Sequence, residues 1–349
     1  MSASRIVALD GLRGVAALIV FVSHYSNETG LFGGILGWGG GQTGVMLFFL
    51  LSGFLVSNLH ISQKLDWSSL WVYIVRRVSR VYPLFLIAAA LPGLLIFLEF
   101  PGQIAMSGIN SIERYLGQVF LLDRGENVFW TIQIEVLFYI VFVGLWFGFG
   151  ALSKTSFFCL VLTCAVLIWF LGPLSNLQFF HTAHYFLFGV LSALIYGGVS
   201  IKHSSRVISL IGLVLLLAMP LTFPKVFKIL FGGDIVSWES SLIVAQLLIV
   251  FNVALRDRYY LRWFLSLRPL VWLGKVSYSV YLIHYFVICG VVSFTTPSDN
   301  YFFNFTMVLT IVLVLSWASN SMLERPMQRA LARAFLNKDL EGSRSTVKS

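Results

Sequence analysis

The chain has 349 residues, of which 58% are hydrophobic, 16% aromatic and only 11% charged, and its mean hydropathy is +0.86. Soluble domains carry about 25% charged residues, because their surface has to face water. This composition excludes a soluble enzyme, a disordered tail and a disulfide scaffold, since much of the apolar surface must face lipid. The net charge of +9 would suggest nucleic-acid binding in a soluble chain, so the positions of the charges decide what it means.

Apolar runs long enough to cross a bilayer recur along the whole chain. The hydrocarbon core is about 30 Å thick and needs about 20 apolar residues in a helix, whereas open strands would leave backbone groups without partners. We therefore predict an all-α, polytopic membrane protein with about ten transmembrane helices. They lie near residues 8–27, 42–60, 82–99, 128–148, 155–172, 182–198, 206–222, 236–254, 271–293 and 301–323. Residues 1–325 form the membrane domain, and residues 326–349 form a basic cytoplasmic tail.

The basic residues indicate how the chain is oriented. With the N- and C-termini in the cytoplasm, all but four of the 24 Lys and Arg residues lie on the inner side. Short loops follow this positive-inside bias, so the net charge reflects topology and we expect no nucleic-acid partner. The lipid bilayer is the expected partner. Arg325, Arg329 and Arg333, spaced four residues apart, predict an interfacial helix against anionic lipid.

Two ionisable residues stand out in the first span, where such groups are costly and point to function. Arg13 and His24 are 11 residues apart, which is three helical turns plus about 20°, so both lie on one face about 16 Å apart along the axis. Glu135, in the fourth span, falls at a depth similar to that of His24. A carboxylate beside an imidazole orients the ring and fixes its tautomer. We predict that Glu135 and His24 pair, either for catalysis or as a structural contact between helices.

Further polar residues are candidates for the same site. Arg76, Arg77 and Arg80 precede the third span, and guanidinium groups suit phosphates, although such arginines also anchor topology. Ser52 and Gly53 in the second span allow a helix break or close packing. The ninth span carries Tyr278, Tyr281 and His284, which either line a cavity or pack as structural residues. The three cysteines form no CxxC pair, so we expect neither a disulfide nor a metal site.

Six motifs occur in order along nearly the whole chain, from about Arg5 to Arg325. They are LDGLRG with Arg13 and His24 eleven residues apart, FFLLSGF at 48–54, the RxxR of Arg77 to Arg80, FWTIQIEVLFY around Glu135, SYSVYLIH at 277–284, and Glu324-Arg325-Pro326. In this pattern the chain resembles the acyltransferase-3 family of membrane acyltransferases, which includes bacterial O-antigen and exopolysaccharide O-acetylases.

The resemblance implies an O-acetyltransferase of the bacterial cytoplasmic (inner) membrane. The donor would be cytoplasmic acyl-CoA, usually acetyl-CoA, used as a substrate and not as a permanently bound cofactor. The acceptor would be a hydroxyl of a cell-surface carbohydrate or a lipid-linked glycan. Some family members carry an additional helix and an esterase-like domain, and here we expect that any such second activity comes from another protein or is not needed. Polysaccharide assembly proteins are candidate partners.

The resemblance also implies roles for the candidate residues. Arg77, Arg80 and Arg76 would hold the CoA phosphates, and Arg13 would either hold the CoA end or pair with Asp10. The pantetheine arm would reach His24, which would act as general base or carry the acyl group as a transient acyl-imidazole. Glu135 would orient His24, and Ser52 or nearby backbone N–H groups would stabilise the oxyanion.

Two other functions are compatible with the same residues. In a proton-coupled transporter or flippase for a sugar or lipid, His24 and Glu135 would relay protons. Transporters of this kind often contain inverted repeats with broken helices, and no such repeat is visible in the sequence. A scaffold subunit of a polysaccharide assembly complex would leave Glu135 without a role.

Overall fold

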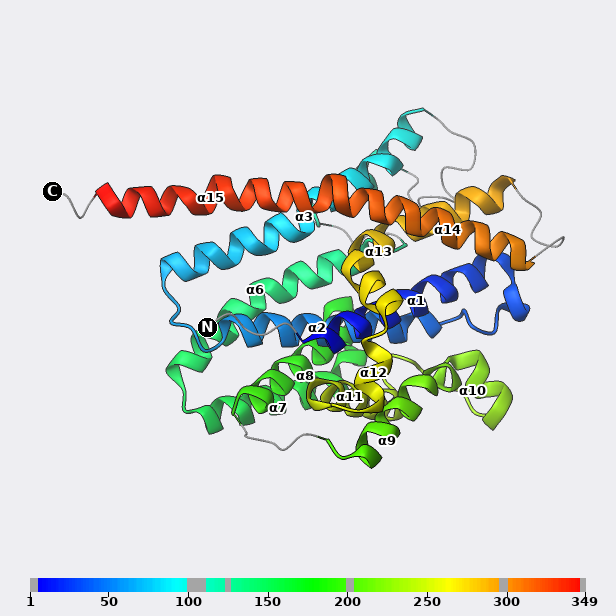
Figure 1. The fold of residues 1–349 in the computed structure, drawn as a ribbon, viewed down its shortest axis with the longest axis horizontal. Coiled ribbons are helices and arrows are strands. Elements are labelled where there is room, and N and C mark those ends of the chain that lie inside the picture. The colour runs from blue at the N-terminus through cyan, green and yellow to red at the C-terminus, as the bar shows by residue number, and fades with distance from the viewer. Residues whose placement is uncertain (1–5, 99–110, 123–126, 199–203, 295–300, 346–349) are drawn as a thin grey trace.

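The structure, a computed structural model, describes residues 6–98, 111–122, 127–198, 204–294 and 301–345 (Figure 1). Within these ranges every regular element is a helix and no strand is present. A lipid environment favours this result, because a helix satisfies its backbone hydrogen bonds internally. The all-α prediction is confirmed.

Seven helices of the described residues are long and apolar enough to cross a membrane. They match seven predicted spans: α1 (Val7–Thr29), α2 (Gly40–His60), α6 (Trp130–Ala151), α7 (Lys154–Leu171), α8 (Gln178–Gly198), α13 (Arg268–Phe294) and α14 (Tyr301–Ser319). Shorter elements connect them: η1 (Leu31–Gly34), α5 (Ile112–Val119), η2 (Gly172–Leu174), α10 (Pro224–Phe231) and α12 (Tyr260–Leu265). The chain is a multi-pass membrane protein.

Two of the ten predicted spans are shorter than expected. α9 (Arg206–Leu217) has 12 residues and α11 (Ser241–Arg256) has 16, which correspond to about 18 and 24 Å of helix. Both fall short of the thickness of the hydrocarbon core. The seventh span ends early because Pro220 starts a 3-10 turn, η3 (Met219–Thr222), where a proline cannot continue an α-helix. The apolar composition of this segment alone does not predict the break.

A third predicted span belongs to a longer helix. α3 (Trp67–Phe97) joins the segment that carries Arg76, Arg77 and Arg80 and the third span in one helix of 31 residues. It continues through Pro83 and Pro92, which membrane helices tolerate because neighbouring groups compensate for the lost hydrogen bonds. The predicted end of the span at residue 99 lies outside the described residues. Arg76, Arg77 and Arg80 therefore lie on the same helix as the third span.

The C-terminal segment continues the last membrane helix. After α14 come a π-helical turn, η4 (Asn320–Glu324), and α15 (Arg325–Ser345), so the predicted tail is helical from its first residue. Pro326 has no N–H to donate to the preceding turn, which favours such an irregular turn. Within it, the buried Glu324 carboxylate accepts hydrogen bonds from Ser279 (2.9 Å) and Asn320 (2.8 Å). The bond from Ser279 attaches the turn that precedes α15 to α13.

Glycines allow the central helices to approach closely. α1 packs along α13 and against α2, and α2 packs along α8. A Cβ added to Gly274 would lie 1.8 Å from the Asp10 carbonyl oxygen, and one added to Gly53 would lie 2.1 Å from that of Phe186. Small residues at such contacts are typical of membrane helix packing. The close-packing interpretation of Ser52-Gly53 is the one that the structure supports.

Replacing Gly274 by Ala should separate α1 from α13. Because the added methyl group meets backbone and not a flexible side chain, the helices themselves have to move, and overpacking of this kind costs about 1–3 kcal/mol or more. We expect a lower thermal unfolding midpoint of the purified protein in detergent. Gly144→Ala is the matched control, since nothing lies within 4 Å of its added Cβ. Equal unfolding midpoints for the two variants would contradict this helix contact.

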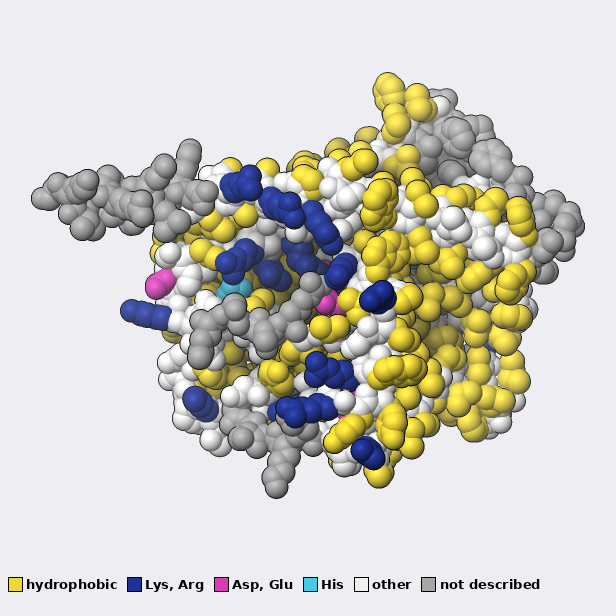
Figure 2. Space-filling model, in the orientation of Figure 1, with side chains coloured by type: hydrophobic (Ala, Val, Ile, Leu, Met, Phe, Trp, Pro, Cys, Tyr) yellow, Lys and Arg dark blue, Asp and Glu magenta, His cyan; other side chains and the backbone are white. Residues whose placement is uncertain are grey.

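The surface is divided between charged and apolar parts. Figure 2 shows Lys and Arg side chains gathered over the left and central parts of the face, whereas the far right carries hydrophobic and uncharged side chains. Many large hydrophobic side chains are exposed, such as Ile140, Phe147 and Phe170 on α6 and α7, as expected for helices that contact lipid. The visible asymmetry agrees with a basic side and an apolar belt.

Candidate functional site

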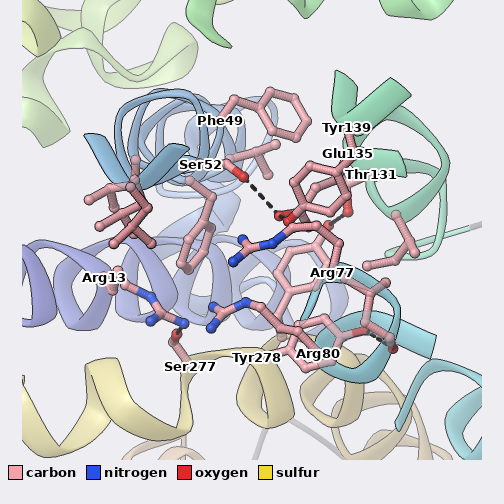
Figure 3. A pocket seen from close by; sticks show the side chains of 18 residues that line it. Arg13, Phe49, Ser52, Arg77, Arg80, Thr131, Glu135, Tyr139, Ser277 and Tyr278 are labelled. Atoms are coloured by element: carbon pink, nitrogen blue, oxygen red, sulfur yellow. Dashed lines mark hydrogen bonds between the residues drawn. The ribbon is translucent and has the colours of Figure 1, made fainter. Parts of the chain in front are cut away.

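A cavity of about 180 Å³ lies between α1, α2, α3, α6 and α13 (Figure 3). Its walls combine cationic, acidic and hydroxyl side chains with apolar ones. The polar lining residues are Arg13, Ser52, Arg77, Arg80, Thr131, Glu135, Tyr139, Ser277, Tyr278 and Tyr281. Five helices therefore contribute to one site. The predicted site residues that line it are Arg13, Ser52, Arg77, Arg80 and Glu135.

Three guanidinium groups converge on this cavity, Arg13 from α1 and Arg77 and Arg80 from α3 (Figure 3). Arg13 donates a hydrogen bond from Nη2 to the Ser277 hydroxyl (3.0 Å), and Arg77 lies over the Tyr139 ring, 5.6 Å from its centroid. Among the described residues none of the three has a carboxylate within 4 Å. Guanidinium groups without a carboxylate partner are suited to bind an anion such as a phosphate.

Glu135 is held by α2 and by its own helix, and not by α1. Its Oε1 accepts a hydrogen bond from the Ser52 hydroxyl (2.9 Å) and a short one from the Tyr139 hydroxyl. The predicted pair of Glu135 with His24 is wrong. The physical reason is the arrangement of the bundle: α6 packs against α2, α3, α7 and α8, whereas α1 packs against α13 and α2.

His24 pairs instead with α13. Its ring lies 5.2 Å from the His284 ring and 5.4 Å from the Tyr285 ring, both in edge-to-face arrangements. Arg13 also contacts α13, through Ser277. The prediction that Arg13 and His24 share one face of the first helix is therefore confirmed, and that face is turned toward α13.

The hydrogen bond of His284 defines its tautomer. Nδ1 lies 3.0 Å from the Val280 carbonyl oxygen, which can only accept, so in the neutral ring Nδ1 carries the proton and Nε2 bears a lone pair. This Nε2 is buried and has no hydrogen-bond partner in the described part of the chain. It is an acceptor available to a donor that arrives beside His24.

Tyr281 connects the cavity with the two histidines. Its ring lies 5.9 Å from that of His284 and 6.1 Å from that of Phe48, and its hydroxyl accepts a hydrogen bond from Thr131 (2.9 Å). Tyr281 and Phe48 both line the cavity, whereas His24 and His284 do not. The histidine pair therefore lies about one helical turn beyond the end of the cavity.

The position of Arg76 differs from the prediction. Its side chain is exposed and does not line the cavity. Consecutive residues of a helix are rotated by about 100°, so Arg76 cannot follow Arg77 inward. Of the three arginines predicted to bind the CoA phosphates together, only Arg77 and Arg80 line the cavity.

Some lining residues were absent from the sequence prediction, namely Thr131, Tyr139 and Ser277. Thr131, Glu135 and Tyr139 are spaced four residues apart in the fourth span, so they lie on one face of α6. This spacing of polar residues in an apolar helix was a signal that could have identified two of them. Ser277 has no such signal, because its role depends on the approach of Arg13.

These features define a multi-pass membrane protein with an arginine-lined cavity and a histidine pair beside it. The family model described as Acyltransferase domain, of acyltransferase-3 type, matches residues 6–320. The chain belongs to this family of acyltransferases.

Two named relatives are similar over nearly the whole chain. O-acetyltransferase OatA of Staphylococcus aureus is 26% identical over 94% of this chain and 58% of its own length. YrhL of Bacillus subtilis, provisionally named a peptidoglycan O-acetyltransferase, is 22% identical over 95% of this chain and 56% of its own. The chain thus spans little more than half the length of these relatives. No solved structure matches it.

Proposed function

We propose that this protein transfers an acetyl group from acetyl-CoA to a hydroxyl of a cell-surface glycan or lipid-linked glycan. The observation that carries the proposal is the cavity in which Arg13, Arg77 and Arg80 converge, with a histidine pair about one turn further along α13. Family membership supports acyl transfer. The names of the relatives, O-acetyltransferase and peptidoglycan O-acetyltransferase, support acetyl as the group and a glycan as the acceptor.

The arginines bind the phosphates of acyl-CoA in this proposal. The basic side chains visible in Figure 2 gather over the left and central parts of the face, which we assign to the cytoplasmic side of the bacterial inner membrane by the positive-inside bias. From Arg13 to His24 the axial distance is about 16 Å, and the pantetheine arm extends along this path. The thioester then has to pass Phe48 and Tyr281, which line the cavity, and Tyr281 lies next to His284.

His24 acts as the general base in the transfer. It takes the proton of the acceptor hydroxyl while that oxygen forms a bond to the thioester carbonyl carbon. The carbon–sulfur bond breaks, and CoA leaves as the thiolate, which is protonated to the free thiol. His284 Nε2 has no hydrogen-bond partner among the described residues, and its ring lies 5.2 Å from that of His24. In the proposed reaction it accepts the N–H of His24 once the acceptor is bound, which directs the other His24 nitrogen toward the hydroxyl.

Glu135 and Ser52 act in the cavity where acyl-CoA binds, and not beside His24. The Ser52 hydroxyl is engaged by Glu135 within the cavity, so it is not placed beside His24 as an oxyanion donor. The Glu135 carboxylate faces a cavity with three guanidinium groups and offsets part of their charge before the CoA phosphates bind. Tyr139 holds the same carboxylate and lies under Arg77, which links the acidic and basic groups.

Mass spectrometry of surface glycans from cells with and without the gene tests this function. We expect the glycan from cells with the gene to be heavier by one acetyl group per modified residue. Purified protein should in addition hydrolyse acetyl-CoA slowly when no acceptor is present. Unchanged glycan masses together with no hydrolysis of acetyl-CoA would contradict the proposal.

The transporter hypothesis relied on His24 and Glu135 as a proton relay. The structure gives each of them other partners, His284 and Tyr285 for one and Ser52 and Tyr139 for the other. The relay therefore lacks its central contact. Uptake of a labelled sugar into vesicles, without consumption of acetyl-CoA, is the result that would restore this hypothesis.

A further inference from the structure

α15 carries a row of exposed arginines beside the cavity helix α3. Arg325, Arg329 and Arg333 are spaced four residues apart, and all three side chains are exposed. α15 packs along α3, and near its C-terminal part the Trp71 indole N–H donates to the Phe335 carbonyl (3.4 Å). The row therefore has a fixed position relative to the arginines of α3.

The register of the two helices brings the arginines to one level. α15 runs back along α3 in the opposite direction (Figure 1), and both helices rise by about 1.5 Å per residue. Counting from the contact between Trp71 and Phe335, Arg329 lies level with Arg77, and Arg325 lies level with the residue after Arg80. Figure 2 shows Lys and Arg side chains over α15 and over α3 on the same face of the molecule.

These charges have no acidic partners in the described part of the chain. Lys228 and Asp234 form the one ion pair found there. Glu324, the carboxylate that precedes Arg325, already accepts hydrogen bonds from Ser279, Asn320 and Gln328. Exposed arginines in a row beside further arginines repel one another and are stabilised by an anion of high charge.

We propose that Arg325 and Arg329 of α15, with Arg76 of α3, bind the 3′-phosphate of the acyl-CoA nucleotide. The inference rests on the proposed function. Arg13, Arg77 and Arg80 in the cavity then bind the diphosphate, and the 3′-phosphate of the ribose lies outside the cavity, where Arg76 is exposed on α3. A dianionic phosphate accepts paired hydrogen bonds from guanidinium groups.

This assignment gives α15 a role different from membrane anchoring. The hydrogen bond from Ser279 to Glu324 attaches the turn that precedes α15 to α13, so the arginine row has a set orientation before the donor binds. Pre-organised groups lose less conformational freedom on binding than flexible ones do. The exposed position of Arg76 outside the cavity is also explained, because it faces the nucleotide end of the donor.

The test compares acetyl-CoA with acetyl-3′-dephospho-CoA as donors for the full-length protein. For the wild type we expect a KM about ten- to a hundredfold lower for acetyl-CoA, the range for a charged hydrogen-bonding contact. In the double variant Arg325→Gln/Arg329→Gln the KM values for the two donors should differ by only a few-fold, because Arg76 alone remains to contact the 3′-phosphate, and kcat should be unchanged. The exposed arginines near α12 supply a matched control, Arg258→Gln/Arg262→Gln, which should retain the wild-type preference.

Three outcomes would overturn the inference. One is a wild type that uses both donors with equal KM, and another is a double variant that keeps the full preference for acetyl-CoA. The third is a double variant whose activity falls in vesicles of phosphatidylcholine with phosphatidylglycerol but not in pure phosphatidylcholine, with the donor preference intact, because this would identify α15 as a lipid-binding helix. A wild type that uses neither donor would instead refute the proposed function itself.

Discussion

Replacing His24 by Ala is expected to reduce kcat for acetyl transfer by about 10²- to 10⁴-fold, the usual contribution of a general base. The KM for acetyl-CoA should stay near the wild-type value, because Arg13, the cavity arginine on the same helix, lies about 16 Å from His24 along the axis of α1. His24 makes no hydrogen bond within the described residues, so its loss breaks no polar contact that holds the bundle. Initial rates of the purified protein, with its thermal unfolding midpoint, measure both quantities.

His181→Ala is the control for a general effect of removing a histidine. His181 lies at the start of α8, where Nε2 contacts the Ser175 carbonyl oxygen (2.8 Å), away from the cavity. A His24→Ala protein that is folded and retains more than about a tenth of the wild-type kcat would identify a different base. A His284→Ala variant should have an intermediate kcat and an unchanged KM, because His284 positions His24 and does not contact the donor phosphates.

Replacing Arg80 by Gln is expected to raise the KM for acetyl-CoA by about ten- to a hundredfold, as expected for the loss of a charged hydrogen bond to phosphate. Arg77→Gln should have an effect of similar size, since both guanidinium groups line the cavity. The kcat at saturating donor should change little, because neither group reaches the histidine pair. The measurement is the dependence of the initial rate on acetyl-CoA concentration.

The conservative variant Arg80→Lys distinguishes charge from geometry. Lysine keeps the charge but lacks the planar fork that binds phosphate through two hydrogen bonds, so we expect only partial rescue of KM. Lys228→Gln is the surface control, because Lys228 is exposed and pairs with Asp234. If Arg80→Gln lowered kcat with an unchanged KM, the cavity would not be the phosphate site.

Helical periodicity made part of the site predictable. The common face of Arg13 and His24 follows from 11 residues of one helix, a local property that holds in any environment. The seven confirmed spans follow likewise from length and apolar composition. The seventh predicted span is divided, because Pro220 breaks the helix after α9 although the sequence around it remains apolar, and α11 is shorter than its predicted span.

Contacts between helices were not predictable in the same way. Depth along the membrane normal placed Glu135 near the level of His24, but it carried no information about which helices are neighbours. Glu135 instead contacts Ser52 and Tyr139, and His284, treated as a candidate lining residue, pairs with His24. Distances around the bundle depend on the packing of all helices at once.

The sequence by itself determined that this is a helical membrane protein with scarce intramembrane charges, because hydropathy, spacing and helical pitch are properties of each segment alone. The tertiary structure alone decided how those charges are divided. Arg13, Arg77 and Arg80 meet Glu135 in one cavity, and His24 meets His284 about one turn beyond it. The physical reason is the glycine-mediated approach of α1 to α13, which turns the face of α1 away from α6 and toward the partner that its side chains contact.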